Sequence, residues 1–435
     1  MRNTTLRRLA PVTLVLVVSL FALSGVGVAG TSGSGSVEGV TPDSIKIGYI
    51  YSKTGVAGST FQNADKGCKA RVDRQNAAGG VNGRKIDIVY TDDQSGVGNN
   101  LTVAQDLVQN QHVYAIMNNS SFAFSSYRWL LDNKVPVIGG GYDGTYYGDK
   151  GNENIISALG NAFPQNGVTS DGLTKFMKAL GVKRVGAVAY GISPSSTAAA
   201  QSLIKYAVPA AGLQKGYLNT TIDFGTTDVG PVVLGIKNDG ADGVYLPLVA
   251  NSNVAIVQGL QQNNVPMKAI VLATGYGQPT LDQPSSQNFG KNVFMASIWA
   301  PVELKTKATK QFQADLKKYA DYTGVPDYGI YTGYIDCDLV ILGLQHAGKN
   351  PTQQGFIDGL HQMGTFNPGG GLGCQDVDIS LQHFGQASPD SCGYYIQIKD
   401  GKFVVYKQKD GDPVWRGKLI AASTQATTTT TAPAS

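Results

Sequence analysis

Charged residues are scarce in this sequence. Asp, Glu, Lys and Arg supply 15% of its 435 residues, against 42% hydrophobic residues, and the formal net charge is +4. Three of the positive charges, Arg2, Arg7 and Arg8, lie in an N-terminal segment that we expect to be removed, which leaves 32 basic and 31 acidic residues. A nearly neutral chain lacks the basic surface that binds nucleic acid, so the composition excludes nucleic acid as a partner.

Signatures of catalysis are also missing. The sequence has no G-x-S-x-G elbow, no H-E-x-x-H motif and no Walker loop. Asp92 and Asp93 are adjacent carboxylates on an expected strand-end loop, where their side chains should diverge. We interpret them as solvated or turn-capping residues, with a carboxylate pair or a cation site as the alternative. None of the histidines falls in an expected strand-end loop; they are His112, His346, His361 and His383. We therefore expect a protein that is not an enzyme and has no metal and no cofactor.

Cysteine is limited to four residues, and no two of them form a C-x-x-C pair. Four cysteines allow three connectivities, and we expect two disulfides in an oxidising compartment. Cys374 and Cys392 bracket an irregular stretch rich in Gly, Pro and Ser, so we pair them with each other. Cys68 and Cys337 lie in two expected helices and form the second pair. Free buried thiols are the alternative.

The only strongly apolar run lies near the N-terminus. Residues 14–23 (LVLVVSLFAL) follow the three arginines and precede small residues that end at Ala29. This pattern predicts a signal peptide over residues 1–29, with an uncleaved anchor as the alternative. No Cys follows the run, so we expect no lipid anchor and a chain exported to the cell envelope or medium.

Small and polar residues dominate both ends of the remaining chain. Residues 30–43 read as a linker, and residues 421–435 form a tail rich in Thr, Ala and Pro. Neither composition can bury a core. The tail fits a spacer, a glycan-bearing stalk or an inert extension.

Between these ends, short apolar strands alternate with amphipathic helices. Such alternation predicts parallel α/β sheets, and its repetition predicts two doubly wound lobes, in which ligands bind beyond the carboxyl ends of the strands. The expected strands are 45–51, 85–91, 112–117, 136–138, 184–190, 243–247 and 268–273. The expected helices are 62–78, 99–109, 122–131, 169–180, 197–207 and 253–262.

One long segment resembles a known family. It combines Thr54-Gly55, the turn NAAGGVNGR at 76–84, the acidic loop DDQS at 92–95, and Asn119-Ser120-Ser121 followed by VPVI at 135–138. Tyr190-Gly191 and the closing KDGKFV at 399–404 also fit. Over residues 44–410 the chain is similar to the branched-chain amino-acid-binding family, whose fold is the type I periplasmic-binding-protein fold.

The resemblance implies a Venus-flytrap protein, whose two lobes are joined by three crossing segments. We place the crossings near Ile156, near Val293 and after Phe366. Lobe 1 would then comprise 44–156 and 293–365, and lobe 2 would comprise 157–292 and 366–420. The strand at 293–296 and a helix at 331–347 would return the chain to lobe 1.

The resemblance also implies a ligand site. Ser120 and Ser121 precede an expected helix, where free backbone N–H groups favour an anion, and this loop holds the ligand's carboxylate in the resembling proteins. A plain N-cap is the alternative. Gly141, Tyr142 and Asp143 fall in the family's second ligand loop; the G-x-G-x-x-G at 139–144 has no dinucleotide-binding context.

Lobe 2 offers further candidates at its strand ends: Tyr190, Asn251, Thr274 and Tyr276. Tyr190 would cover the ligand, with a packing role as the alternative. The acidic residue that the family carries near Thr274 is missing, while Asp143 is added. We therefore expect a polar or charged ligand, such as an amino acid or amide bound in a rearranged way.

These patterns predict an extracytoplasmic solute-binding subunit of an ABC importer. It would act as a monomer, with a small-molecule ligand and a membrane permease as its partners. A ligand-sensing receptor module of the same fold, acting with a signalling protein, is the alternative.

Overall fold

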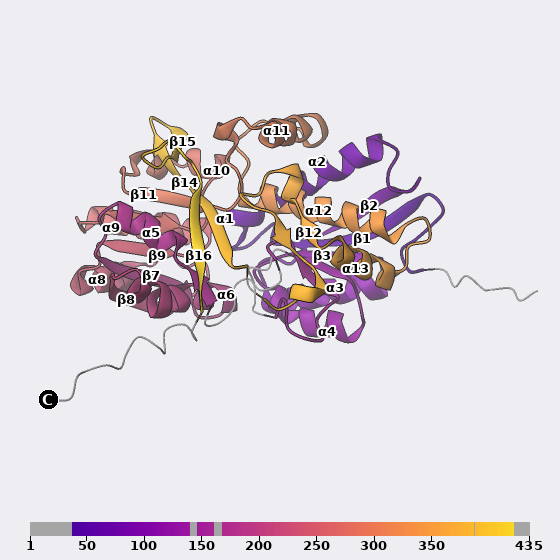
Figure 1. Cartoon of the computed structure of the whole chain (residues 1–435), viewed down its shortest axis with the longest axis horizontal. Helices are drawn as coiled ribbons and strands as arrows, with labels where there is room; N and C mark the ends of the chain where they lie inside the picture. Colours follow the sequence, from indigo (N-terminus) through magenta and orange to yellow (C-terminus); the bar gives the residue numbers. More distant parts are fainter. Residues whose placement is uncertain (1–36, 140–145, 161–167, 387, 422–435) are drawn as a thin grey trace, which may run out of the picture. The chain divides into compact units, whose positions relative to one another are not determined.

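A computed structural model describes residues 37–139, 146–160, 168–386 and 388–421 (Figure 1). The expected signal peptide and three candidate ligand residues, Gly141, Tyr142 and Asp143, lie outside these ranges, as does nearly all of the Thr-rich tail.

A parallel sheet forms the core of lobe 1. Among the described residues its strand order is β2-β1-β3-β4-β5, and every neighbouring pair is parallel. Strands buried on both faces read as continuous apolar runs, which explains the sequence IKIGYIY in the interior strand β1. The bounds are β1 Ser44–Tyr51, β2 Lys85–Asp92, β3 Ala115–Asn119, β4 Val137–Gly139 and β5 Ile155–Ser157.

A larger, mixed sheet forms the core of lobe 2. Within the described ranges its order is β6-β16-β14-β11-β10-β9-β7-β8, with β15 paired to β14. The strands from β8 to β11 run parallel, whereas β14, β15, β16 and β6 are antiparallel to their neighbours. The bounds are β6 Val168–Ser170, β7 Arg184–Tyr190, β8 Gln214–Ile222, β9 Gly243–Leu246, β10 Ala269–Leu272, β11 Val293–Ser297, β14 Asp390–Lys399, β15 Lys402–Tyr406 and β16 Trp415–Ala421.

Helices pack against these sheets and bury their apolar faces (Figure 1). The α-helices are α1 Gly58–Phe61, α2 Ala64–Ala77, α3 Val97–Gln109, α4 Tyr127–Asp132, α5 Gly172–Ala179, α6 Pro194–Ser202, α7 Val208–Ala210, α8 Gly230–Asp239, α9 Ala250–Gln262, α10 Gln278–Leu281, α11 Lys307–Ala320, α12 Tyr328–Ala347 and α13 Gln353–Met363. A π-helical segment, Leu203–Ala207, joins α6 to α7. A small pair of strands, β12 Thr365–Phe366 and β13 Val377–Asp378, lies between α13 and β14.

Helix α12 returns the chain to lobe 1, as the sequence predicted. It packs along α2, although more than 250 residues separate the two helices in the sequence. Gly67 and Gly333 allow this close approach, because a Cβ atom at either position would lie 2.0 Å from a backbone oxygen of the other helix. The disulfide Cys68–Cys337 joins the same two helices.

The expected return of strand 293–296 to lobe 1 was wrong. This strand, β11, pairs in parallel with β10 and antiparallel with β14, so it belongs to the lobe 2 sheet. The physical reason is that its apolar side chains, including Phe294 and Met295, complete the buried faces of that sheet. Residue 169, expected to begin a helix, lies in β6, and β8 and α8 were not predicted.

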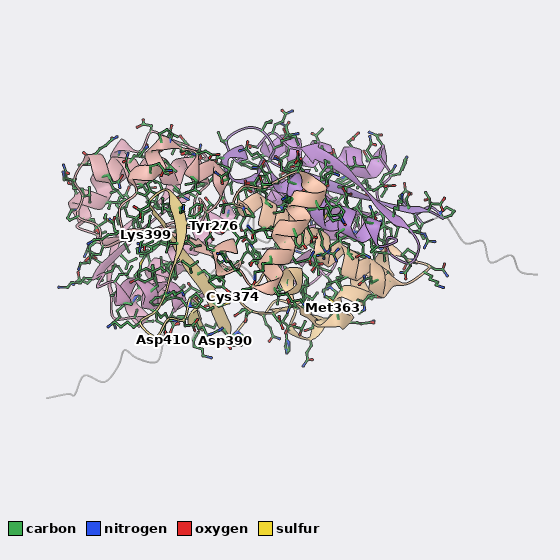
Figure 2. The ribbon with its side chains drawn as sticks, turned by 90° about the horizontal axis from the view of Figure 1, so that it is seen from above. Tyr276, Met363, Cys374, Asp390, Lys399 and Asp410 are labelled. Carbon is green, nitrogen blue, oxygen red and sulfur yellow. A yellow bond between two sulfur atoms is a disulfide. The ribbon has the colours of Figure 1, made fainter. Side chains whose placement is uncertain are left out.

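Both expected disulfides are present. Besides Cys68–Cys337, Cys374 (Figure 2) is bonded to Cys392 at the start of β14. The α/β fold with two doubly wound sheets is confirmed.

Candidate ligand-binding site

A pocket of about 340 Å³ lies at the strand ends of both lobes. Its lining is mostly apolar and aromatic: Phe61, Leu159, Leu173, Tyr190, Phe224, Tyr245, Leu248, Val249, Ile298, Tyr328, Tyr394, Tyr395 and Trp415. The lining also includes serine and threonine residues: Thr60, Ser121, Ser170, Ser193, Ser195, Ser196, Thr274, Ser297 and Ser391. Among the described residues, the lining contains no Asp, Glu, Lys, Arg or His.

The two serines after β3 differ in what they contact. Ser121 lines the pocket, and within the described residues its hydroxyl has no hydrogen-bond partner. Ser120 is fully buried and does not line the pocket; its hydroxyl donates to Asp93 and accepts from the backbone N–H of Phe122 at 3.0 Å. The loop thus exposes one hydroxyl to a ligand and uses the other to hold itself in place.

Asp93 anchors this loop from behind. Its buried carboxylate accepts hydrogen bonds from Ser52 Oγ at 2.8 Å, the Ser95 N–H at 3.0 Å and Asn100 Nδ2 at 3.0 Å, in addition to Ser120. The four donors satisfy a charge that would otherwise be costly to bury.

The Asp92 side chain points away from this network and caps a different segment of backbone. It accepts from the N–H groups of Lys53, Thr54 and Gln94. Burial opposes ionisation, but the hydrogen bonds from Thr54 and the backbone outweigh it and keep the Asp92 pKa below its ordinary value. The interpretation of the adjacent carboxylates as turn caps is confirmed.

Tyr190 and Thr274 line the pocket with hydroxyls that are already engaged. The Tyr190 oxygen accepts from the Val249 N–H at 3.2 Å, and burial raises the pKa of Tyr190 to about 12. Thr274 Oγ1 donates to the Leu248 carbonyl at 2.7 Å and accepts from Asn253 Nδ2 at 3.1 Å. Both residues therefore present apolar surface to the pocket.

Asn251, the second residue of α9, is not part of the lining. Its side-chain oxygen accepts from Ser59 Oγ at 3.3 Å, and its amide nitrogen donates to the Gly225 carbonyl at 3.2 Å. Beside it, the Ala250 N–H donates to Thr60 Oγ1 at 3.0 Å. Asn251 therefore takes part in a contact between the two lobes.

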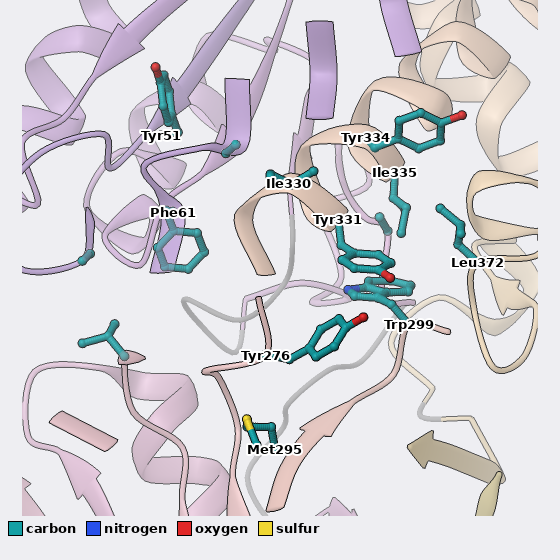
Figure 3. Close-up of a cluster of buried hydrophobic side chains, with 14 of the residues drawn as sticks. Tyr51, Phe61, Tyr276, Met295, Trp299, Ile330, Tyr331, Tyr334, Ile335 and Leu372 are labelled. Carbon is teal, nitrogen blue, oxygen red and sulfur yellow. The ribbon is translucent and has the colours of Figure 1, made fainter. Parts of the chain in front are cut away.

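Tyr276 also lies outside the main pocket and points into an aromatic cluster with Trp299 and Tyr331 (Figure 3). Its hydroxyl donates to Glu303 Oε2 at 2.7 Å and accepts from the Val302 N–H at 3.0 Å. Burial raises the pKa values of both Tyr276 and Glu303. The structure thus gives Tyr276 a packing environment.

Three longer helices begin at the pocket. Gly172 opens α5, Ser195 and Ser196 lie in the first turn of α6, and Val249 is the N-cap of α9; all four line the pocket. Helix N-termini present free N–H groups and a partial positive charge, which favour a carboxylate or hydroxyl oxygen.

Besides the expected Tyr190 and Thr274, lobe 2 contributes Tyr245, Tyr395 and Trp415 to the lining, and these three were not predicted as ligand residues. Tyr245 lies in a strand that was expected, and only the alternation of its side chains could have indicated that it faces the site. Tyr395 and Trp415 lie on β14 and β16, two strands whose sequences contain no recognisable ligand-site motif.

Most of the chain matches the model of one family. Residues 44–402 fit the model of the periplasmic binding proteins. The chain belongs to the periplasmic binding protein family. Its sheets and strand-end pocket have the architecture of that fold.

Solved structures agree on the fold. A fatty acid ABC transporter substrate-binding protein from Thermomonospora curvata has a TM-score of 0.71 at 20% identity, over 86% of this chain and 93% of that one. A branched-chain amino acid transporter substrate-binding protein from Streptococcus pneumoniae, in complex with isoleucine, has a TM-score of 0.66 at 19% identity, over 84% and 100%. A solute-binding protein from R. palustris, in complex with 4-hydroxybenzoate, has a TM-score of 0.67 at 21% identity, over 84% and 96%.

A comparison with curated proteins gives no significant match. In the described part of the chain, no helix is long and apolar enough to cross a membrane. The same residues contain no group of three or more His, Cys, Asp or Glu side chains that could hold a metal ion.

Proposed function

We propose that this chain is the extracytoplasmic solute-binding subunit of an ABC importer, and that it captures a small solute with a large apolar body. Membership of the periplasmic binding protein family supports the binding role. The ABC transporter proteins of similar fold support the importer. The observation that carries the proposal is the 340 Å³ pocket with its apolar and aromatic lining.

The lining favours an apolar solute over the amino acid or amide expected from the sequence. A zwitterion buried in the pocket would need a carboxylate for its ammonium group, because an unpaired buried charge is costly. The described lining offers no such group, and Asp143 lies outside the described residues. The free hydroxyl of Ser121 and the starts of α5, α6 and α9 suit one small polar or anionic group on the solute.

The proposed partners follow from this role. The loaded protein would deliver its solute to a membrane permease, and it would act as an exported monomer outside the cytoplasmic membrane. The predicted signal peptide over residues 1–29 belongs to the same proposal.

Thermal unfolding against a panel of solutes tests the function. The protein is first unfolded and refolded to remove any bound compound, and then heated with aromatic carboxylates, medium-chain fatty acids, amino acids and sugars. A solute at about 1,000 times its dissociation constant adds roughly 4 kcal/mol to stability. We expect a raised midpoint with an apolar carboxylate or a related compound. A shift with amino acids or sugars alone would contradict the apolar solute, and no shift in any class would contradict solute capture.

A further inference from the structure

The pocket extends deep into lobe 2. Beyond the strand ends it is lined by Leu173 of α5 and Tyr245 of β9, which pack against one apolar core cluster, and by Ala199 of α6, the neighbour in sequence of the cluster member Ala200. This part of the pocket therefore lies between one face of the lobe 2 sheet and the helices that cover it.

Small side chains leave this space open. Ala199 on α6, Ala296 on β11 and Gly172 at the start of α5 all line the pocket. Ala199 and Ala296 retain partial exposure although each lies on an element that packs in the core. Larger residues at these positions would fill the space, as they do elsewhere in the sheet.

Two tyrosines present unpartnered hydroxyls to this deep part. Tyr245 and Tyr395 both line the pocket, and neither hydroxyl has a hydrogen-bond partner among the described residues. Tyr395 is only 6% exposed, and its ring is held by stacking on Phe176 at 3.5 Å between centroids and by an edge contact with Trp415 at 6.1 Å. The position of the Tyr395 hydroxyl is therefore fixed by its neighbours.

Other tyrosines near the pocket have hydroxyl partners, although Tyr394, which lines the pocket, has none among the described residues. Tyr190 and Tyr276 bond to backbone N–H groups, and Tyr331 donates to the Ala300 carbonyl at 2.9 Å. Burial raises the pKa values of both Tyr245 and Tyr395. Both hydroxyls are therefore available to hydrogen-bond a ligand in the pocket.

We propose that the ligand of the deep pocket carries a neutral oxygen, as in an alcohol, phenol or ketone, that hydrogen-bonds to the hydroxyls of Tyr245 and Tyr395. The proposal rests on the apolar-solute function above and narrows its ligand class. A neutral oxygen fits better than a carboxylate, because the described lining has no cation to balance a charge at this depth.

Calorimetric titration with matched ligand pairs tests the assignment. One pair is 4-hydroxybenzoate and 4-methylbenzoate, and the other is 10-hydroxydecanoate and undecanoate; the members of each pair differ by a hydroxyl in place of a methyl group. The variants are Tyr245→Phe and Tyr395→Phe. Tyr406→Phe is the matched control, because Tyr406 packs against the same Phe176 and Trp415 without lining the pocket.

We expect the wild type to prefer the hydroxyl member of at least one pair by about tenfold. Each pocket variant should bind the hydroxyl member about five- to tenfold more weakly and should bind the methyl member with nearly unchanged affinity. Tyr406→Phe should bind both members as the wild type does. The inference would be overturned if the wild type bound these solutes without preferring the hydroxyl member, or if the two pocket variants bound them as the wild type does. Either result would leave the proposed function standing. No binding of any of the four compounds would overturn the apolar-solute function itself.

Discussion

The two neighbouring serines in the loop after β3 have different roles. Ser120 is buried in the Asp93 network, while the Ser121 hydroxyl faces the pocket. The two residues are adjacent and chemically identical. Replacing each with alanine therefore distinguishes the stabilisation of the loop by Ser120 from the binding of the solute by Ser121.

We expect Ser121→Ala to weaken solute binding about five- to tenfold and to leave the unfolding midpoint of the free protein unchanged, because only a hydroxyl toward the ligand is lost. Ser120→Ala should instead lower the stability of the free protein by about 1–3 kcal/mol, because Asp93 loses a buried donor. Denaturant unfolding and calorimetric titration of both variants measure the two effects. Equal binding by Ser121→Ala and the wild type would refute a ligand contact at Ser121.

Asp336 is a second residue with a distinct physical signature. It lies in α12 with 1% exposure, and its Oδ2 has no hydrogen-bond partner. Burial raises the pKa of Asp336 to about 8, and its carboxyl group in turn helps raise the pKa of the buried Tyr49. Asp336 is therefore protonated in the folded protein at neutral pH.

This raised pKa predicts a loss of stability with rising pH. Between about pH 4 and about pH 8 the unfolded chain releases the Asp336 proton and the folded chain keeps it, so the contribution to unfolding free energy falls by up to about 1.4 kcal/mol per pH unit. In Asp336→Asn this contribution should disappear. The free energy of unfolding of the variant, relative to that of the wild type, should therefore increase as pH rises from 5 to 8. Urea unfolding of both proteins across that range measures the difference; parallel pH profiles would contradict a raised pKa.

At the scale of elements, glycines set the distance between α2 and α12. Gly67 lies in α2, where a Cβ atom would meet the Ile330 carbonyl oxygen at 2.0 Å. Gly98 in α3 has nothing within 4 Å of its Cβ position. Both glycines are helical, Gly67 in the fourth position of α2 and Gly98 in the second position of α3, and only Gly67 has a neighbouring helix at its Cβ position.

Gly67→Ala should destabilise the protein by at least about 1–3 kcal/mol, because the clash involves backbone atoms and the helices must separate. Gly98→Ala should be neutral or stabilise by up to about 1 kcal/mol through helix propensity. Chemical denaturation of the two variants provides the comparison. If both substitutions have the same small effect, the close approach of α2 and α12 is wrong.

The elements also show what the sequence could and could not predict. Parallel strands bring their carboxyl ends to one edge of a sheet, so Ser121, Tyr190 and Thr274 could be placed at the pocket from strand positions alone. Tyr394 and Tyr395 are neighbours on β14, and both are apolar-facing and buried. Both line the pocket, and sequence alone could not indicate this, since both faces of the strand are covered.

The same limit explains the misplaced strand β11. Its apolar sequence fits a central strand of either sheet, and its partners, β10 and β14, are set by long-range pairing. Local patterns determine that such a segment is a strand, but its sheet depends on contacts far away in the sequence.

For the whole molecule, the fold carries less information about the ligand than the pocket does. Proteins of the same fold with about 20% identity bind a fatty acid, isoleucine or 4-hydroxybenzoate according to their descriptions. Function on a shared fold lies in the side chains of the site. The central claim is therefore that a solute occupies the apolar pocket that reaches into lobe 2.

The most direct test is to close that pocket with one side chain. Ala199→Leu fills the deep part from α6, and Gln201→Leu places the same side chain on the exposed surface of the same helix. Calorimetric titration uses the solute that gives the largest thermal shift in the panel. We predict that Ala199→Leu loses at least about tenfold in affinity while remaining folded, and that Gln201→Leu binds as the wild type does. Equal affinity in all three proteins would contradict the account, because the solute would then bind somewhere other than this pocket.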